Sequence, residues 1–219
     1  MPLSSVLGAS SVIKPGVVTS STRPAVPYEG QLIYETDTKR VAAWNGSAWI
    51  YETSADGPPG LVLIKTQTIN SAVSSVTVSD AFTSTYDNYK IMISNGVGST
   101  ELQLNMTLGS SSTQYYSSGI YTDYSTGSVG SANSSNSSSW IRAGYSNTSV
   151  GQTFMNMDIF GPNLAYATFA TSLISRNGNN LGTVKYLHNV ATAYTSFTLT
   201  TSTGTITGGT IRVYGYANS

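Results

Sequence analysis

The sequence predicts an all-β protein: an N-terminal extended arm and a short β-meander, followed by a C-terminal antiparallel β-sandwich of the jelly-roll type. Three observations support this prediction. Apolar and polar residues alternate in many short segments, turn-forming residues separate these segments, and no segment has the apolar spacing of an amphipathic helix. The clearest segment is 101–108, where Leu102, Leu104, Met106 and Leu108 alternate with polar residues. Such alternation buries one face of a strand and leaves the other in water.

The rest of the C-terminal region repeats this pattern. We expect further strands at 61–69, 73–78, 89–94, 153–160, 165–174, 183–190, 196–201 and 209–216. Turn sequences such as Asn95-Gly96 and Gly208-Gly209 lie between them and tolerate the backbone conformations that tight turns need. Many short strands of this kind indicate a β-sandwich, and we expect jelly-roll topology from the fold class alone.

A proline-containing segment divides the chain. Residues 57–60 read Gly-Pro-Pro-Gly, and consecutive prolines fix the backbone φ angle and cannot donate hydrogen bonds to a sheet. We therefore predict a hinge at 57–60 that separates an N-terminal domain, 1–56, from a C-terminal domain, 61–219.

Residues 23–52 are predicted to form the meander, with strands at 31–35, 40–44 and 47–51. Asn45-Gly46 is a strong hairpin signal, because both residues tolerate positive φ angles. A sheet of about twenty residues buries too little apolar surface to be stable alone, and the chain has no cysteine to cross-link it. We therefore expect other copies of the chain to stabilise it. The candidate oligomerisation and docking residues are Tyr34, Trp44, Trp49 and Tyr51.

Residues 1–22 are small, often β-branched and almost uncharged. We expect two extended pieces here, at 11–14 and 17–20. Two interpretations stay open: a solvated tail, or an anchoring arm that adds strands to a neighbouring sheet.

The composition limits the possible partners. The formal net charge is zero, so neither a nucleic acid nor a membrane surface is indicated as a partner. Charged residues make up 9% of the 219 residues, against about 25% in ordinary globular domains. So few charges protect a monomer poorly against self-association, whereas a subunit of a large assembly does not depend on them. The N-terminus lacks a convincing signal-peptide pattern, and no apolar run is long enough for a spanning helix.

Residues 109–140 break the strand pattern and are predicted to form a long irregular loop. The loop is rich in serine, glycine and tyrosine, a mixture that binding loops use because rigid rings supply contact area and small polar residues adapt. Aromatic faces beside uncharged hydrogen-bonding groups also suit neutral sugars. The candidate ligand-binding residues are Tyr115, Tyr116, Tyr121, Tyr124 and Trp140. The alternative is a solvated spacer or a hairpin that covers a neighbour in a trimer.

The sequence offers no recognisable catalytic motif. His188 is the single histidine and shares a predicted strand face with Val184 and Tyr186, which indicates a packed residue and not a base or ligand. No Gly-x-Ser-x-Gly motif marks a nucleophile, and no metal-binding or phosphate-binding motif is present. We therefore expect no enzymatic activity, no cofactor and no metal. Asp80 and Asp87 bracket a turn-like segment, and Asp123 and Asp158 are isolated, so the sequence brings no two of these acids together.

Two parts of the chain resemble known proteins. Residues 29–38 (EGQLIYETDT) and 44–49 (WNGSAW) resemble a segment common in tail fibres, head fibres and related appendages of tailed bacteriophages. Residues 87–91 (DNYKI) and 209–215 (GTIRVYG) are similar to the C-terminal β-domains of such proteins. The resemblance implies a homotrimeric component of the virion and supplies no catalytic residue.

The sequence thus leads to a specific functional hypothesis. Residues 1–56 would dock on other virion proteins, and the sandwich would project and bind a host-surface glycan. One alternative is a capsid decoration or tail-assembly component that cements neighbouring subunits. Another is a surface-polysaccharide depolymerase, which would need two facing carboxylates about 5 to 9.5 Å apart.

Overall fold

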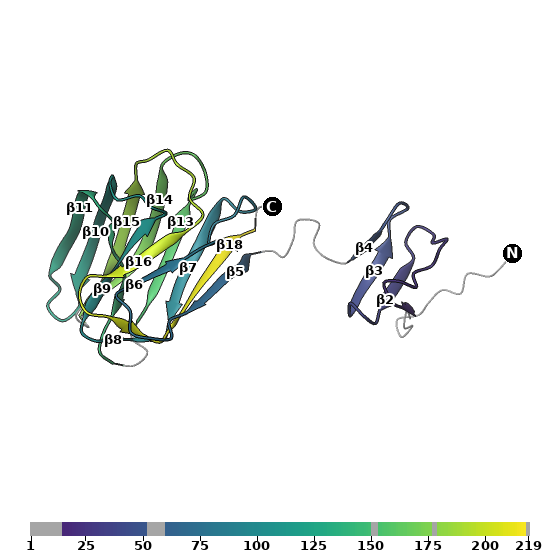
Figure 1. Ribbon diagram of the computed structural model, residues 1–219, viewed down its shortest axis with the longest axis horizontal. Helices are drawn as coiled ribbons and strands as arrows, with labels where there is room; N and C mark the ends of the chain where they lie inside the picture. The colour runs from purple at the N-terminus through teal and green to yellow at the C-terminus, as the bar shows by residue number, and fades with distance from the viewer. Residues whose placement is uncertain (1–14, 52–59, 150–152, 177–178, 218–219) are drawn as a thin grey trace. The chain divides into compact units, whose positions relative to one another are not determined.

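The computed structural model describes residues 15–51, 60–149, 153–176 and 179–217, and every regular element in these residues is a β-strand. The chain forms two compact units, Met1–Gly57 and Pro58–Ser219 (Figure 1). The boundary falls within the segment predicted as the hinge, whose residues 57–59 lie outside the described residues. The described residues include no helix long and apolar enough to cross a membrane.

The first unit contains one sheet of four short strands in the order β1-β2-β3-β4. They are β1 (Gly16–Val18), β2 (Leu32–Glu35), β3 (Arg40–Trp44) and β4 (Trp49–Tyr51). The last three form the predicted antiparallel meander. The extended piece expected at 17–20 overlaps β1, which pairs in parallel with β2 of its own chain. The piece expected at 11–14 lies outside the described residues.

The core of this first unit is very small. Among its described residues, the buried side chains are Ile33, Glu35 and Ala42. Ile33 and Ala42 lie opposite each other on β2 and β3. Because so few apolar side chains leave water, hydrophobic burial within one copy contributes little to the stability of this sheet.

The second unit is a jelly roll. Its eight principal strands are β5 (Leu61–Thr68), β6 (Ser75–Val78), β7 (Asn88–Ser94), β9 (Leu102–Leu108), β12 (Trp140–Ser146), β13 (Met155–Phe160), β16 (Phe197–Thr201) and β18 (Thr210–Tyr216). They pair in the orders β5-β18-β7-β13 and β6-β16-β9-β12. The chain crosses between these two layers at each step except from β9 to β12, and all pairs are antiparallel. This is the jelly-roll topology that the sequence predicted.

Two inserted hairpins widen one layer. The strands β14 (Thr168–Arg176) and β15 (Asn180–His188) follow β13, and β10 (Tyr115–Asp123) and β11 (Val129–Ser137) follow β9. Together with the first layer they form a long eight-stranded sheet in the order β11-β10-β15-β14-β13-β7-β18-β5 (Figure 1). The short strands β8 (Val97–Gly98) and β17 (Ile206–Thr207) pair separately.

The prediction of an irregular loop at 109–140 is therefore wrong. Most of that segment is the β10–β11 hairpin, and β10 pairs with β15 over its whole length. The inward positions of β10 include Ser117 and Gly119, so its buried face lacks the apolar alternation that marks other strands. A Cβ atom on Gly119 would lie 2.8 Å from a methyl carbon of Val184, which shows why a residue without a side chain is needed there.

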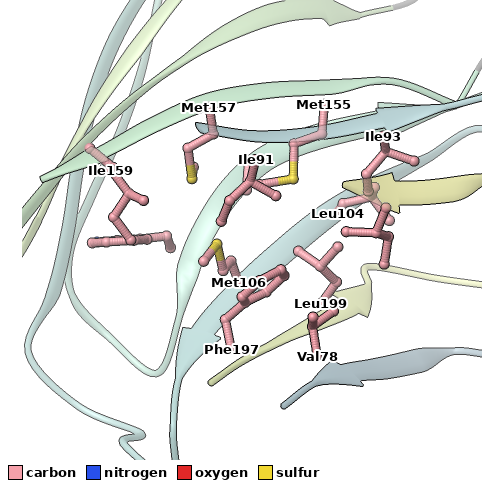
Figure 2. Close-up of a cluster of buried hydrophobic side chains, with 14 of the residues drawn as sticks. Val78, Ile91, Ile93, Leu104, Met106, Met155, Met157, Ile159, Phe197 and Leu199 are labelled. Atoms are coloured by element: carbon pink, nitrogen blue, oxygen red, sulfur yellow. The ribbon is translucent and has the colours of Figure 1, made fainter. Parts of the chain in front are cut away.

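The core lies between the two layers of the sandwich. Met155, Met157 and Ile159 of β13 are buried there. Figure 2 shows how side chains of β13 and β7 face those of β9, β16 and β6. The labelled members of this cluster are Val78, Ile91, Ile93, Leu104, Met106, Met155, Met157, Ile159, Phe197 and Leu199. Since the core fills the space between the layers, a ligand can reach only the outer faces and edges of the sheets.

Candidate functional site: the outer face of the long sheet

Two of the predicted ligand-binding residues are structural. Tyr115 and Trp140 are fully buried, and their rings meet edge to face with centroids 5.7 Å apart. Leu108 N–H donates to the Tyr115 hydroxyl at 2.8 Å, and Trp140 Nε1 donates to the Leu187 carbonyl at 3.0 Å. Burial raises the pKa of the Tyr115 phenol. The prediction that these two rings bind a ligand is wrong, because both occupy inward positions of their strands.

The other three predicted tyrosines lie at separate places. Tyr116 is half-buried on the outer face of β10. Tyr121 is half-buried on the inward side, where its ring covers Gly130, and a Cβ atom on that glycine would lie only 2.4 Å from Tyr121 Cζ. Tyr124 lies beyond the end of β10 and is 61% exposed. They form no joint site, and Tyr116 is the one positioned beside other candidate residues.

His188 is a packed residue, as predicted. Its imidazole is buried and stacks on the Tyr115 ring with centroids 4.1 Å apart. His188 Nε2 lies 2.8 Å from the Tyr194 hydroxyl, and Nδ1 lies 3.3 Å from the Gln114 carbonyl. Burial lowers the pKa of His188. These contacts with Tyr115, Tyr194 and Gln114 hold the ring in the wall of the sandwich.

The acidic residues have local structural roles. Asp123 accepts hydrogen bonds from the backbone N–H and the hydroxyl of Ser125, which holds the pKa of Asp123 below its usual value. Asp158 lies 3.0 Å from Lys90 Nζ and accepts a hydrogen bond from the Tyr216 hydroxyl. Within the described ranges, no three His, Cys, Asp or Glu side chains gather closely enough to hold a metal ion.

One predicted docking residue, Tyr51, binds a buried carboxylate in the first unit. Glu35 is buried and accepts hydrogen bonds from Arg23 Nε at 2.5 Å, the Tyr51 hydroxyl at 2.7 Å and the Thr38 hydroxyl at 2.9 Å. The hydrogen bond from Arg23 is the main reason that the pKa of Glu35 is lowered. Tyr51 is thus tied into its own chain.

The remaining docking candidates keep accessible surface. The rings of Trp44 and Trp49 meet edge to face with centroids 5.6 Å apart, and both are half-buried. Tyr34 is also half-buried on β2. The indoles are therefore neither enclosed in this subunit nor fully exposed, and part of each ring is left for contacts with another molecule.

The outer face of the long sheet carries two aligned rows of side chains. The strand registers place Tyr116, Leu187, Phe169 and Phe160 side by side across β10, β15, β14 and β13. We call this the aromatic row. The same registers align Ser118, Lys185, Thr171, Asp158 and Lys90 from β10 to β7, which we call the polar row. A ligand lying across the strands would meet both rows.

An open depression of about 280 Å³ is lined by residues of both rows. We call it the aromatic depression. It is lined by Tyr116, Ser117, Ser118, Phe169, Lys185, Tyr186 and Leu187. Phe169 is 54% exposed although it belongs to a strand of the sandwich. Apolar rings around a few polar groups are typical of small-ligand sites.

Comparison with models of known protein families and with curated proteins finds no match to this chain.

Sequence reasoning missed Phe169, Lys185 and Leu187 as members of a site. A signal was available in segment 165–174, where Phe169 and Leu173 alternate with Thr168, Ala170 and Ser172, which face the core. A strand with apolar residues on both faces has one face to cover with something outside its own sandwich. Strand order, which the sequence alone does not give, is needed to bring Phe169 next to Leu187 and Tyr116.

Proposed function

We propose that this protein is an appendage of a bacteriophage virion that binds a host-surface glycan through the aromatic depression. The observation that carries the proposal is that the half-buried ring of Tyr116 and the exposed ring of Phe169 lie with the hydroxyl of Ser118 on one open face. Sugar rings present apolar C–H faces and many hydroxyl groups. Aromatic faces with adjacent hydrogen-bonding groups match that chemistry.

The virion assignment is supported by the N-terminal unit. Its segments 29–38 and 44–49 resemble those of phage fibres, and its core contains only Ile33, Glu35 and Ala42 among the described residues. So small a core favours a unit that is completed by other copies or by a docking partner. We infer a homotrimer that docks on other virion proteins through residues 1–56.

Trimerisation would also strengthen attachment. One open depression makes few contacts, so a single site is expected to bind weakly. Three sites on one stem bind a repetitive surface polymer with an avidity that exceeds each affinity by roughly 10²–10⁴. Weak individual sites are therefore compatible with firm adsorption.

One observation favours a second candidate, a component that cements neighbouring virion subunits. The edge strand β11 has nine residues and contains neither a charged residue nor a proline. From Val129 to Ser134 it runs in unbroken register with β10. The other edge of this sheet, β5, carries Lys65 and a register shift. Uncharged regular edges invite pairing with a strand of another chain.

The depolymerase alternative has no comparable support. In the described part of the outer face, Asp158 is bound by Lys90 and by Tyr216. A second depression lies next to the aromatic depression, and Asp158 is the acidic residue that lines it.

The double substitution Tyr116→Ala with Phe169→Ala tests the proposed function. Particles carrying it should assemble normally and lose adsorption to host cells, because the stacking surface is gone. The matched control is Tyr124→Ala, which removes an exposed ring outside the depression and should leave adsorption unchanged. Normal adsorption of the double variant, together with loss of assembly when Ser131 on β11 is changed to Pro, would favour the cementing function.

A further inference from the structure

A second depression lies beside the aromatic one on the same face of the long sheet. It measures about 170 Å³ and is lined by Lys90, Asn156, Asp158, Thr171, Ser172 and Leu173. We call it the polar depression. The aromatic depression centres on β15 and the polar one on β13, with β14 between them. Two strand spacings separate these centres by about 10 Å, which is the length of a short oligosaccharide.

The polar row connects the two depressions. Lys185 lines the aromatic depression, and its neighbour in register, Thr171, lines the polar one. The two sites therefore share a continuous track across the strands.

Lys185 is the unbalanced charge on this track. Its side chain is exposed, and it belongs to none of the three ion pairs found among the described residues. Farther along the row, Lys90 and Asp158 bind each other at 3.0 Å. The track therefore carries one positive charge near its β10 end and a neutralised pair at its β7 end.

We propose that the track binds an acidic oligosaccharide, with its anionic group at Lys185. One sugar ring lies on Tyr116 and Phe169 in the aromatic depression. The next sugar lies in the polar depression, where Lys90 donates and Asp158 accepts hydrogen bonds without adding net charge. This inference rests on the proposed glycan-binding function and adds the charge and the extent of the ligand.

Asn156 supports a polar ligand in the second depression. Its Oδ1 atom is buried and has no hydrogen-bond partner among the described residues. A buried acceptor without a hydrogen-bond partner lowers the stability of the folded protein. Rotation of the side chain would present that oxygen to a ligand hydroxyl and remove the cost.

Titration calorimetry of the full-length protein with three probes tests the proposal. The probes are an alginate oligosaccharide, which carries carboxylates, a dextran sulfate oligosaccharide, which carries sulfates, and a neutral dextran oligosaccharide. Lys185→Met should weaken binding of whichever anionic probe the protein binds roughly tenfold, since a charge-assisted hydrogen bond is lost. It should leave binding of the neutral dextran unchanged. Lys185→Arg should retain the preference for the anionic probe.

The control for net charge is Lys65→Met on β5, which lies five strands from β15 in the sheet. It should not alter binding of any probe. Thr171→Val tests the extent of the site: it should weaken binding of a tetrasaccharide several-fold and leave a monosaccharide unaffected.

The outcomes separate this inference from the proposed function. Dependence on Lys185 with alginate or with dextran sulfate supports the inference and identifies the anionic group. Equal binding of dextran and alginate that depends on Tyr116 but not on Lys185 would overturn the inference and leave the glycan function standing. Failure of all three probes, and of the host's own surface polysaccharide, would overturn both.

Discussion

The imidazole of His188 lies flat on the phenol ring of Tyr115, with 4.1 Å between centroids and 12° between ring planes. This stack joins β15 to β10 inside the wall of the sandwich. It explains why two residues that look chemically promising in the sequence, a lone histidine and a loop tyrosine, serve packing instead. It also makes the inserted hairpin sensitive to the charge of one ring.

Acidification between pH 7.5 and 5.5 is predicted to destabilise the sandwich through His188. Burial lowers the pKa of His188, so the folded state prefers the neutral ring, whereas the unfolded chain takes up a proton near pH 6.5. The unfolded state binds more protons in this window, so the free energy of unfolding falls as the pH falls through it. Urea unfolding at both pH values, followed by circular dichroism, measures this change.

The variant His188→Gln should remove this pH dependence, because His188 is the single histidine and carboxylates titrate at lower pH. The variant will be less stable at both pH values. An unchanged difference between pH 7.5 and 5.5 in the variant would show that His188 is not the group responsible.

Trp140→Ala is predicted to lower the free energy of unfolding by about 3–5 kcal/mol, the usual cost of deleting a fully buried large aromatic side chain. It also leaves the Leu187 carbonyl without its donor. Tyr124→Ser, at an exposed position, should change the stability by no more than about 0.5 kcal/mol. Thermal unfolding of both variants makes the comparison. A stable Trp140→Ala protein that loses glycan binding would restore the ligand-binding role first predicted for this ring.

Light scattering of the purified protein is predicted to give the mass of a trimer. Trp44→Ala with Trp49→Ala should convert the trimer into monomers, because both half-buried indoles keep part of their surface free for contacts between copies. Tyr28→Ala in the same unit is the control: that ring is exposed and outside the indole pair, so the variant should stay trimeric. A wild-type protein that is monomeric at all concentrations would contradict the proposed assembly.

The sequence predicted most of the fold for a clear physical reason. In β9, alternating leucine and methionine residues sit on the buried face, and simple alternation finds such strands. The alternation pattern did not identify β10 and β11, because serine, glycine and alanine fill their inward positions against close neighbours. β10 is held by pairing with the distant strand β15, and β11 is held by pairing with β10. Pairing between distant segments leaves no periodic mark in the sequence.

The candidate site was predicted less well than the fold. Tyr116 was identified, but with it came Tyr115, whose side chain points to the opposite face of the same strand. Phe169 and Lys185 come from the β14–β15 hairpin, whose strand β15 lies beside β10 only because the inserted segments join one sheet. The composition indicates which types of residue form the site, whereas the strand order decides which individual residues belong to it.

The most direct test of the account is a nuclear magnetic resonance titration of the full-length protein with surface polysaccharide purified from its host. The account predicts chemical-shift changes centred on Tyr116, Phe169, Lys185 and Thr171, on the outer face of β10, β15 and β14. Shift changes confined to the β11 edge, or none at saturating polysaccharide, would contradict it.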